Sequence, residues 1–445
     1  MNKIYETFSF SGESVNCYGL EIVSRRLKTF GYEIRPLDYN TTNTVLVSLY
    51  WPDQLFDFIK WRFAGVMKNK RVLVGGNYPT TSPAAILPFC DGIFLGDGEG
   101  WDGSEESEYI ITKETTKPVQ RYVEKNIVPF NYEDVQFSRR SFVEISRGCK
   151  NKCLFCQYGW LKSYREADYT DINEVVKRAK TKSVRVFAAD RFQHSKYLKI
   201  RAVLDTLGKC DTGSDVSIRF LLKHPEYLKF TNKVRTGIEG MSERLRRMVL
   251  KNFTDDDLCS FSKLVSDSKI KCLDYYMIYG LPTENDSDVD AFYSFIEKLD
   301  GVMPDKYTIA IHWNAFTPSA QTPFQWEAPA IGDHSRMKAF FESRPNKKIC
   351  VYHKPKLAND WTLIRRMLAI RADIHNAKLC FNFAMKESEF KKRPETLLNM
   401  FQKESGCDLV GAWPKEKPLP WDKYCVYEKD KMLFLADCQK QKYGQ

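Results

Sequence analysis

Short apolar runs alternate with amphipathic segments through the first quarter of the chain. The apolar runs have the length and β-branched content of buried strands, and the segments between them have the 3–4-residue apolar spacing of helices. The expected strands are Thr44–Leu49, Arg71–Val74 and Ile93–Leu95, and the expected helices are Tyr18–Thr29 and Trp51–Lys68. Strands that alternate with helices indicate a parallel sheet. Residues 1–104 are therefore predicted to form an open, Rossmann-like α/β domain.

The same rhythm resumes after a polar connector at residues 105–140. The expected strands are Phe142–Ile145, Val184–Ala188, Ser217–Leu221, Val234–Ile238, Leu273–Ile278 and Tyr307–Ile311. Right-handed crossovers would close these strands into a partial barrel over residues 141–330. Residues 331–445 contain helical runs at Thr362–His375 and Pro394–Glu404, which predict a mainly helical C-terminal extension.

Three cysteines follow the first strand of the expected barrel. Cys149, Cys153 and Cys156 have the spacing C-x3-C-x2-C, and Gly148 permits a turn directly after the strand. Three thiolates hold three irons of a four-iron, four-sulfur cluster and leave the fourth iron open to a small molecule. A buried core helix is one alternative, although Gly148 and Asn151 suit it poorly. A zinc site is another, although no second pair of ligands lies nearby.

With Phe155 directly before the last cysteine, the motif resembles the signature of radical SAM enzymes. In that family the open iron binds S-adenosylmethionine (SAM), and one electron from the cluster cleaves it to methionine and a 5′-deoxyadenosyl radical. The resemblance implies that Cys149, Cys153 and Cys156 are the cluster ligands and that Phe155 lies beside the cofactor. It also implies that residues 141–330 are a partial (β/α)6 radical SAM barrel.

Two further segments resemble family contacts to the two ends of the amino-acid part of SAM. Ser217 and Arg219 resemble a strand with a polar or cationic contact to the carboxylate, and an ordinary strand with one exposed arginine is the alternative. Glu239 ends the run Gly237-Ile238-Glu239 and resembles the glutamate that faces the SAM amino group; a helix-starting acid is the alternative. Asp190, after an earlier strand, is expected either to face the cofactor or to cap a helix.

Later segments extend the resemblance toward the C-terminus. Gly280, Leu281 and Pro282 end an apolar strand in the manner of the family motif G-L-P-x-E, whose backbone approaches the adenine and ribose. The segments Phe316–Trp326 and Leu419–Asp422 are similar to those of a subgroup with an N-terminal cobalamin-binding-type domain.

Glycines directly follow two of the N-terminal strands. Gly75, Gly76, Gly96 and Gly98 would let a ligand approach the backbone at the carboxyl edge of the sheet. The pattern resembles the cobalamin-type domain of the same subgroup, but the D-x-H-x-x-G cobalt-ligand motif is absent. Two outcomes stay open: cobalamin bound without a protein ligand below cobalt, and a degenerate domain without the cofactor.

Charge and composition leave the substrate open. The formal net charge is +11, and the basic excess lies outside residues 1–104. A nucleic-acid partner and a solvated basic surface both explain this excess. The product is equally open, between methylation through cobalamin and modification of a nucleic-acid base or small molecule.

The remaining expectations concern the environment of the protein. No apolar run reaches the length of a membrane span, and the N-terminus lacks a signal-peptide pattern, so we expect no membrane and a cytoplasmic location. An external one-electron donor such as flavodoxin or ferredoxin is implied by the resemblance. The competing class is a noncatalytic iron–sulfur or nucleic-acid-binding protein with a structural or sensing cluster; Arg219, Glu239 and the motif at Gly280 favour the enzyme.

Overall fold

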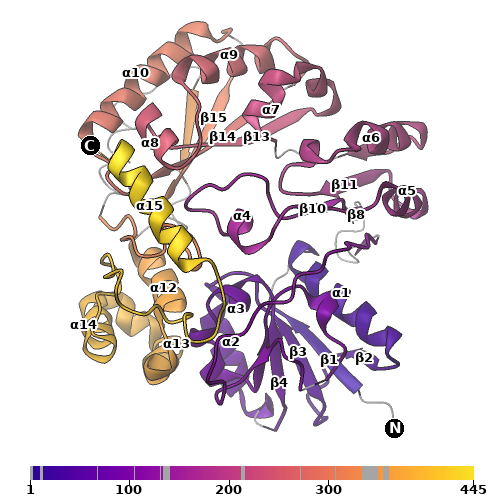
Figure 1. The fold of residues 1–445 in the computed structure, drawn as a ribbon, viewed down its shortest axis with the longest axis vertical. Helices are drawn as coiled ribbons and strands as arrows, with labels where there is room; N and C mark the ends of the chain where they lie inside the picture. Colours follow the sequence, from indigo (N-terminus) through magenta and orange to yellow (C-terminus); the bar gives the residue numbers. More distant parts are fainter. Residues whose placement is uncertain are drawn as a thin grey trace.

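The N-terminal sheet lies beneath a split barrel in Figure 1, and the C-terminal helices lie beside both. This computed structural model describes residues 4–10, 14–67, 69–104, 106–130, 132–133, 141–211, 216–270, 272–305, 307–332, 349–353 and 360–444. Mixed α/β architecture with parallel sheets confirms the predicted fold class.

Six strands form the N-terminal sheet, in the order β2-β1-β3-β4-β5-β6. They are β1 Ile4–Ser9, β2 Glu33–Pro36, β3 Thr44–Ser48, β4 Val72–Gly75, β5 Gly92–Phe94 and β6 Ile110–Ile111. The first five run parallel and β6 is antiparallel. Leu46 and Leu73 pack with helix α1 (Ser14–Thr29), whereas alternate residues such as Val45 and Val72 pack with α2 (Gln54–Phe63). A short helix, α3 (Asn77–Thr81), follows β4.

The sequence analysis missed β1, β2 and β6 in this sheet, β6 lying in the predicted connector, and overestimated one helix. The expected helix Trp51–Lys68 is shorter, because α2 ends at Phe63 and a 3-10 turn, Gly65–Met67, follows it.

The barrel consists of two four-stranded sheets, ordered β12-β11-β8-β7 and β13-β14-β15-β16. Their strands are β7 Tyr132–Glu133, β8 Ser141–Glu144, β11 Ser183–Phe187, β12 Cys210–Asp211, β13 Lys233–Glu239, β14 Cys272–Tyr279, β15 Ile309–Ala315 and β16 Ile349–His353. The helices that alternate with them are α4 Gln157–Leu161, α5 Tyr169–Arg178, α6 Tyr197–Thr206, α7 Ile218–Lys223, α8 Glu243–Met248, α9 Asp255–Ser266 and α10 Asp286–Val302. A small antiparallel ribbon, β9 (Ser146–Arg147) with β10 (Arg165–Glu166), brackets the cysteine loop.

One predicted strand of the barrel is wrong. Ser217–Leu221 is not extended: helix α7 begins at Ile218, with Ser217 at its N-cap position. Ile218 and Leu221 are both buried, and their spacing of three residues fits a helix face rather than the alternation of a strand. At this seam the Val216 N–H donates to the Arg235 carbonyl at 3.2 Å, which links the two sheets.

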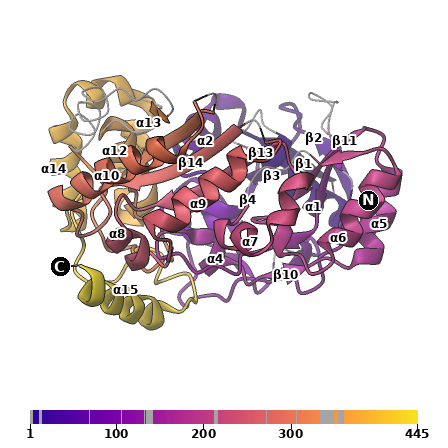
Figure 2. The same cartoon turned by 90° about the horizontal axis from the view of Figure 1, so that it is seen from above.

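The C-terminal part is helical with one unpredicted strand. Strand β16 extends the second barrel sheet in parallel to β15. Helices α12 (Asp360–Arg371), α13 (Ala377–Lys392) and α14 (Pro394–Ser405) share one apolar core with the N-terminal sheet, where Phe383 packs on Phe56. Helix α15 (Lys429–Tyr443) returns to the barrel, and Arg244 at the start of α8 donates to the carbonyl of Tyr443 at 2.5 Å. Figure 2 shows the C-terminal helices and α5–α6 at opposite ends of the molecule. Among the described residues, no helix has the length and apolar character needed to cross a bilayer.

Candidate functional site

The cysteine loop leaves the first barrel strand through a turn that only glycine can make. Gly148 has φ +81°, and a Cβ there would lie 2.3 Å from the carbonyl oxygen of Ser163. Cys149 and Cys156 are partly exposed, and Cys153 is buried. The Trp160 indole donates to the Cys153 carbonyl at 3.0 Å, which fixes the loop against α4.

The three thiols share one loop but do not converge on one point. Among the described residues, no three His, Cys, Asp or Glu side chains are placed to hold a single metal ion. A four-iron cluster does not need such convergence, because each thiolate binds a different iron. Burial raises the pKa of all three thiols, that of Cys153 to about 12. The donor set nevertheless fits a cluster, because iron competes with the proton for each thiolate sulfur and replaces it. Phe155 packs against the barrel core from the same loop.

The carboxylate of Asp190 lies between the cysteine loop and the start of α7. Burial raises its pKa to about 6, and the carboxylate also adds to the raised pKa of Cys149. It accepts from the Phe192 N–H at 3.1 Å and caps a 3-10 turn, Arg191–Gln193. Asp190 therefore caps a helical turn, as one of the two alternatives predicted, and its carboxylate also lies near the cysteine loop.

Ser217 is near Asp190, but Arg219 is not inside the barrel. The Ser217 backbone amide stabilises the charged form of Asp190. Arg219 is exposed on α7, and its guanidinium lies 5.8 Å from the Phe253 ring centroid. The predicted contact of Arg219 to SAM was based on a strand, but this segment is a helix. The basis of that prediction is therefore wrong.

At the end of β13, Glu239 meets a partly buried lysine, Lys251, that the sequence analysis did not single out. The Lys251 Nζ lies 3.5 Å from Glu239 Oε1. Burial raises the pKa of Glu239, although Lys251 opposes that rise. Burial lowers the pKa of Lys251, but Glu239 and the thiols of Cys153 and Cys156 outweigh it and raise the value. The structure thus places an acid and a cation together beside two of the three thiols.

The backbone at Glu239 is specialised for this position. Glu239 has φ +65°, which is rare for a residue with a side chain. Its carboxylate folds back over Gly237, where a Cβ would lie 1.9 Å from Glu239 Oε1. Glycine at 237 therefore makes room for the carboxylate.

The turn after β14 is held by its own glutamate. The Glu284 carboxylate accepts from the N–H groups of Gly280 at 2.8 Å and Leu281 at 3.3 Å. Gly280 has φ +69°, Leu281 is buried and Pro282 follows it at the surface of the turn. Because both N–H groups are already bonded, a ligand at this turn would meet the carbonyl oxygens and apolar groups.

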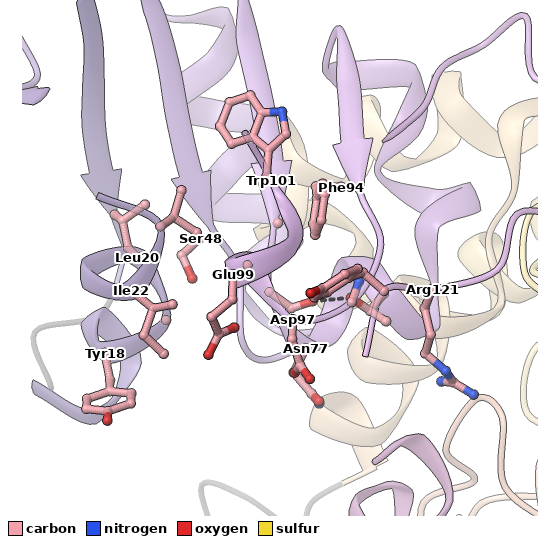
Figure 3. Close-up of a pocket in the computed structure, with 18 of the residues that line it drawn as sticks. Tyr18, Leu20, Ile22, Ser48, Asn77, Phe94, Asp97, Glu99, Trp101 and Arg121 are labelled. Atoms are coloured by element: carbon pink, nitrogen blue, oxygen red, sulfur yellow. Dashed lines mark hydrogen bonds between the residues drawn. The ribbon is translucent and has the colours of Figure 1, made fainter. Parts of the chain in front are cut away.

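A large pocket opens at the carboxyl edge of the N-terminal sheet and faces the barrel (Figure 3). It is lined by the predicted glycines Gly75, Gly76, Gly96 and Gly98. Its inner part is an apolar slot between α1 and the sheet, lined by Leu20, Val23, Leu46, Leu73, Phe94 and Trp101. Its outer wall comes from the barrel, through residues such as Arg147, Tyr158 and Lys162.

The pocket reaches the cysteine loop. Tyr50, which follows β3, lines the pocket, and the Cys156 thiol adds to the rise that burial causes in the Tyr50 pKa. Tyr158 lies on α4, two residues after Cys156, and lines the same pocket. The N-terminal crevice therefore lies next to the cysteine loop.

Charged residues join the pocket to the barrel. Asp97 is buried and pairs with Arg147 at 3.3 Å, Lys162 at 3.2 Å and Arg165 at 2.9 Å. Burial raises the pKa of Asp97, but these three cations outweigh it and hold the value below its usual range. Arg147 also pairs with Glu144 at 2.7 Å and with Glu99 at 2.8 Å. Each of these contacts except Arg147–Glu144 crosses from the N-terminal sheet to the barrel.

A comparison with known protein families identifies a match within the barrel. Residues 143–296 match the model of the radical SAM superfamily. This part of the chain is a radical SAM domain. The domain supports the enzyme rather than the noncatalytic alternative.

Relatives and solved structures extend the likeness over most of the chain. An uncharacterized protein of Methanocaldococcus jannaschii is 22% identical over 81% of this chain and 83% of its own length. A putative methylthiotransferase of the same organism is 24% identical over 65% of this chain and 74% of its own.

Two solved structures share the arrangement of the radical SAM domain with its N-terminal sheet. The radical SAM methyltransferase TsrM from Kitasatospora setae, with cobalamin and a [4Fe-4S] cluster bound, has a TM-score of 0.52 and 12% identity over 73% of this chain and 74% of that one. The cobalamin-dependent radical enzyme OxsB, with aqua-cobalamin and SAM bound, has a TM-score of 0.52 and 12% identity over 99% of this chain and 79% of that one. At such identities the likeness establishes the fold.

Proposed function

We propose that the chain is a cobalamin-dependent radical SAM enzyme that transfers a methyl group. The observation that carries this proposal is the proximity of the N-terminal pocket to the cysteine loop, through Tyr50 and Tyr158. A ligand seated in the pocket would face whatever binds at the loop. TsrM, which shares this fold, is a methyltransferase with cobalamin and a cluster bound, and the likeness to a putative methylthiotransferase points to the same class of group transfer.

Cys149, Cys153 and Cys156 would hold the [4Fe-4S] cluster, and Glu239 and Lys251 would hold SAM beside it. When bound, the cluster supplies the electron that cleaves SAM. The carboxylate of Glu239 would accept hydrogen bonds from the SAM ammonium, and the ammonium of Lys251 would donate to the SAM carboxylate. Because this acid and this cation are 3.5 Å apart, they match the two charges of an amino acid in one place.

The remaining predicted residues would frame the SAM nucleoside and the cluster. Phe155 and Asp190 lie at the loop, with Ser217 beside Asp190. The turn at Gly280–Pro282 offers carbonyl oxygens to the adenine or ribose. Arg219 would act only from the rim, because it is exposed.

Cobalamin would sit in the pocket at the sheet edge. The apolar slot between α1 and the sheet suits its aromatic nucleotide tail, and the open space at Gly75, where a Cβ would meet nothing within 4 Å, suits close approach of the corrin. None of the described residues that line the pocket is a histidine, which favours cobalamin without a histidine below cobalt. Tyr50, which lines this pocket, would lie beside the bound cobalamin.

Anaerobic reconstitution tests the proposal. The parent protein should bind about four irons and four sulfides, form 5′-deoxyadenosine slowly with dithionite, and retain stoichiometric cobalamin after gel filtration. Replacement of Cys149, Cys153 or Cys156 by Ala should abolish the cluster, whereas Cys210→Ala, at an exposed thiol, should not. Stoichiometric zinc without a visible chromophore would contradict the whole proposal. SAM cleavage without cobalamin retention would contradict the cobalamin-dependent part.

A further inference from the structure

Arg121 lines the pocket at the end away from α1. Figure 3 shows Arg121 on the opposite side of Asp97 from Tyr18 and Leu20. Its Nη1 donates to the Gln321 Oε1 at 3.1 Å. Arg121 is largely buried, and burial lowers its pKa although Cys425, Asp97 and Glu428 oppose this. This is a cation in a site that water reaches poorly.

The fold holds Arg121 in place from both sides. The next residue, Tyr122, bonds to the N-terminal sheet, where its N–H donates to the Leu95 carbonyl at 2.9 Å. Two residues earlier, Val119 bonds to the C-terminal tail, where its N–H donates to the Tyr424 carbonyl at 2.9 Å. The side chain of Gln321 is fixed in turn by donation to the carbonyls of Thr80 and Thr81 at 3.1 and 3.0 Å. The backbone on either side of Arg121 is therefore bonded to the N-terminal sheet and to the C-terminal tail, which fixes its position.

The other cations of the pocket already have carboxylate partners. Arg147, Lys162 and Arg165 all pair with Asp97. Within the described part of the chain, Arg121 pairs with no carboxylate, and its hydrogen-bond acceptor is the neutral amide of Gln321. Asp97 and Glu428 act on this cation only from beyond ion-pair distance, so a ligand can supply the direct anionic partner.

We propose that Arg121 binds the anionic group, a phosphate or carboxylate, of the substrate. The inference rests on the proposed function and names a chemical class for its substrate. Arg121 lies near Lys152 of the cysteine loop and near Glu428 of the C-terminal tail, so an anion there is held between the N-terminal crevice and the cluster. The carboxylate of SAM has Lys251 instead, and the cobalamin tail has the apolar slot at the far end of the pocket.

Anion binding tests this role without requiring turnover. The cluster-loaded full chain, with SAM and cobalamin present, is titrated by calorimetry with inorganic phosphate and separately with acetate. We expect the parent to bind at least one of them, Arg121→Gln to bind it about tenfold or more weakly, and Arg121→Lys to stay within a few-fold, because a charge-assisted hydrogen bond is lost only in the first variant. Arg178→Gln removes an equal charge from an exposed position and should change nothing.

Several outcomes would overturn the assignment. Parent protein that binds neither anion would do so, as would Arg121→Gln with unchanged affinity. Loss of SAM binding or of cobalamin retention in Arg121→Gln would assign the arginine to a cofactor instead. Cluster content and 5′-deoxyadenosine formation in the parent report on the proposed function separately, so a failure of that function and a failure of this inference give different results.

Discussion

At the residue scale, the candidate SAM site depends on an unusual backbone at one position. Glu239 adopts a left-handed conformation at the end of β13 and folds its carboxylate over Gly237. Such strain persists only where the surroundings enforce it, and it often marks functional positions. Lys251 and the thiols of the cysteine loop surround this carboxylate, so its orientation decides whether acid and cation face one ligand.

Gly237→Ala tests that orientation. The new Cβ would occupy the space of Glu239 Oε1, and because that atom ends a flexible side chain, the carboxylate should move while the fold remains. SAM affinity should fall about tenfold, the effect of losing one charge-assisted hydrogen bond. Equilibrium binding of SAM to cluster-loaded protein measures it. Gly301→Ala in α10, where a Cβ meets nothing within 4 Å, is the matched control; affinity equal to the parent in both variants would exclude this role for Gly237.

Glu239→Ala tests the carboxylate directly. Without the acceptor for the ammonium, SAM binding should weaken at least as much as in Gly237→Ala. The partly buried Lys251 would then lack its partner, so thermal unfolding must be recorded beside SAM binding to separate lost affinity from lost stability. Unchanged SAM affinity would show that β13 does not end at the SAM amino group.

At the element scale, strands were predicted where a local run of apolar residues marks them, and missed where pairing depends on distant segments. The runs at Thr44–Leu49 and Arg71–Val74 carry their own signal, and both form strands. Ser217–Leu221 was wrong because three apolar residues in a short run fit either period, and only burial of Ile218 with Leu221 decides for a helix. Strand β16 forms by addition to β15, which no local pattern reveals. Likewise, Lys251 becomes a site residue only once the chain folds back to Glu239.

A substitution at the sheet edge can separate an effect on cobalamin binding from an effect on stability. Gly75 points at open space in the pocket, whereas Gly76 has φ +114° and a Cβ there would lie 2.4 Å from the Leu49 carbonyl oxygen. Gly75→Leu should therefore leave thermal stability within about 1 kcal/mol of the parent but reduce cobalamin retention. Gly65→Leu, at a position with nothing within 4 Å and outside the pocket, controls for a bulky residue. Full retention in Gly75→Leu would place cobalamin elsewhere or exclude it.

At the scale of the whole molecule, three separate parts of the chain converge on one site. The N-terminal sheet and C-terminal helices share an apolar core, and the ion pairs of Asp97 tie that sheet to the barrel. The pocket therefore lies between the N-terminal sheet and the barrel. The cysteine loop is also open to solvent at Lys150, which is exposed.

This exposed side is where we expect the external electron donor to dock. Lys150 is half exposed, and Lys196 is exposed. Burial is the main cause of the lowered pKa of His194, and the charges of Lys150 and Lys196 lower it further, so both lysines lie near this histidine. Lys431 at the start of α15 lies near Lys152. Flavodoxins and ferredoxins present acidic surfaces, so complementary charge would speed their encounter with this loop.

Charge reversal at this surface separates docking from chemistry. The double variant Lys150→Glu with Lys196→Glu should form 5′-deoxyadenosine about tenfold more slowly with reduced flavodoxin at low salt, and the difference should shrink as salt screens the charges. With dithionite, a small reductant that needs no docking surface, its rate should equal that of the parent. Lys263→Glu on α9, at another exposed lysine, should behave as the parent with both reductants. A loss of rate with dithionite would mean that the substitutions damage the cluster loop, and an unchanged rate with flavodoxin at low salt would place the donor on a different face of the molecule.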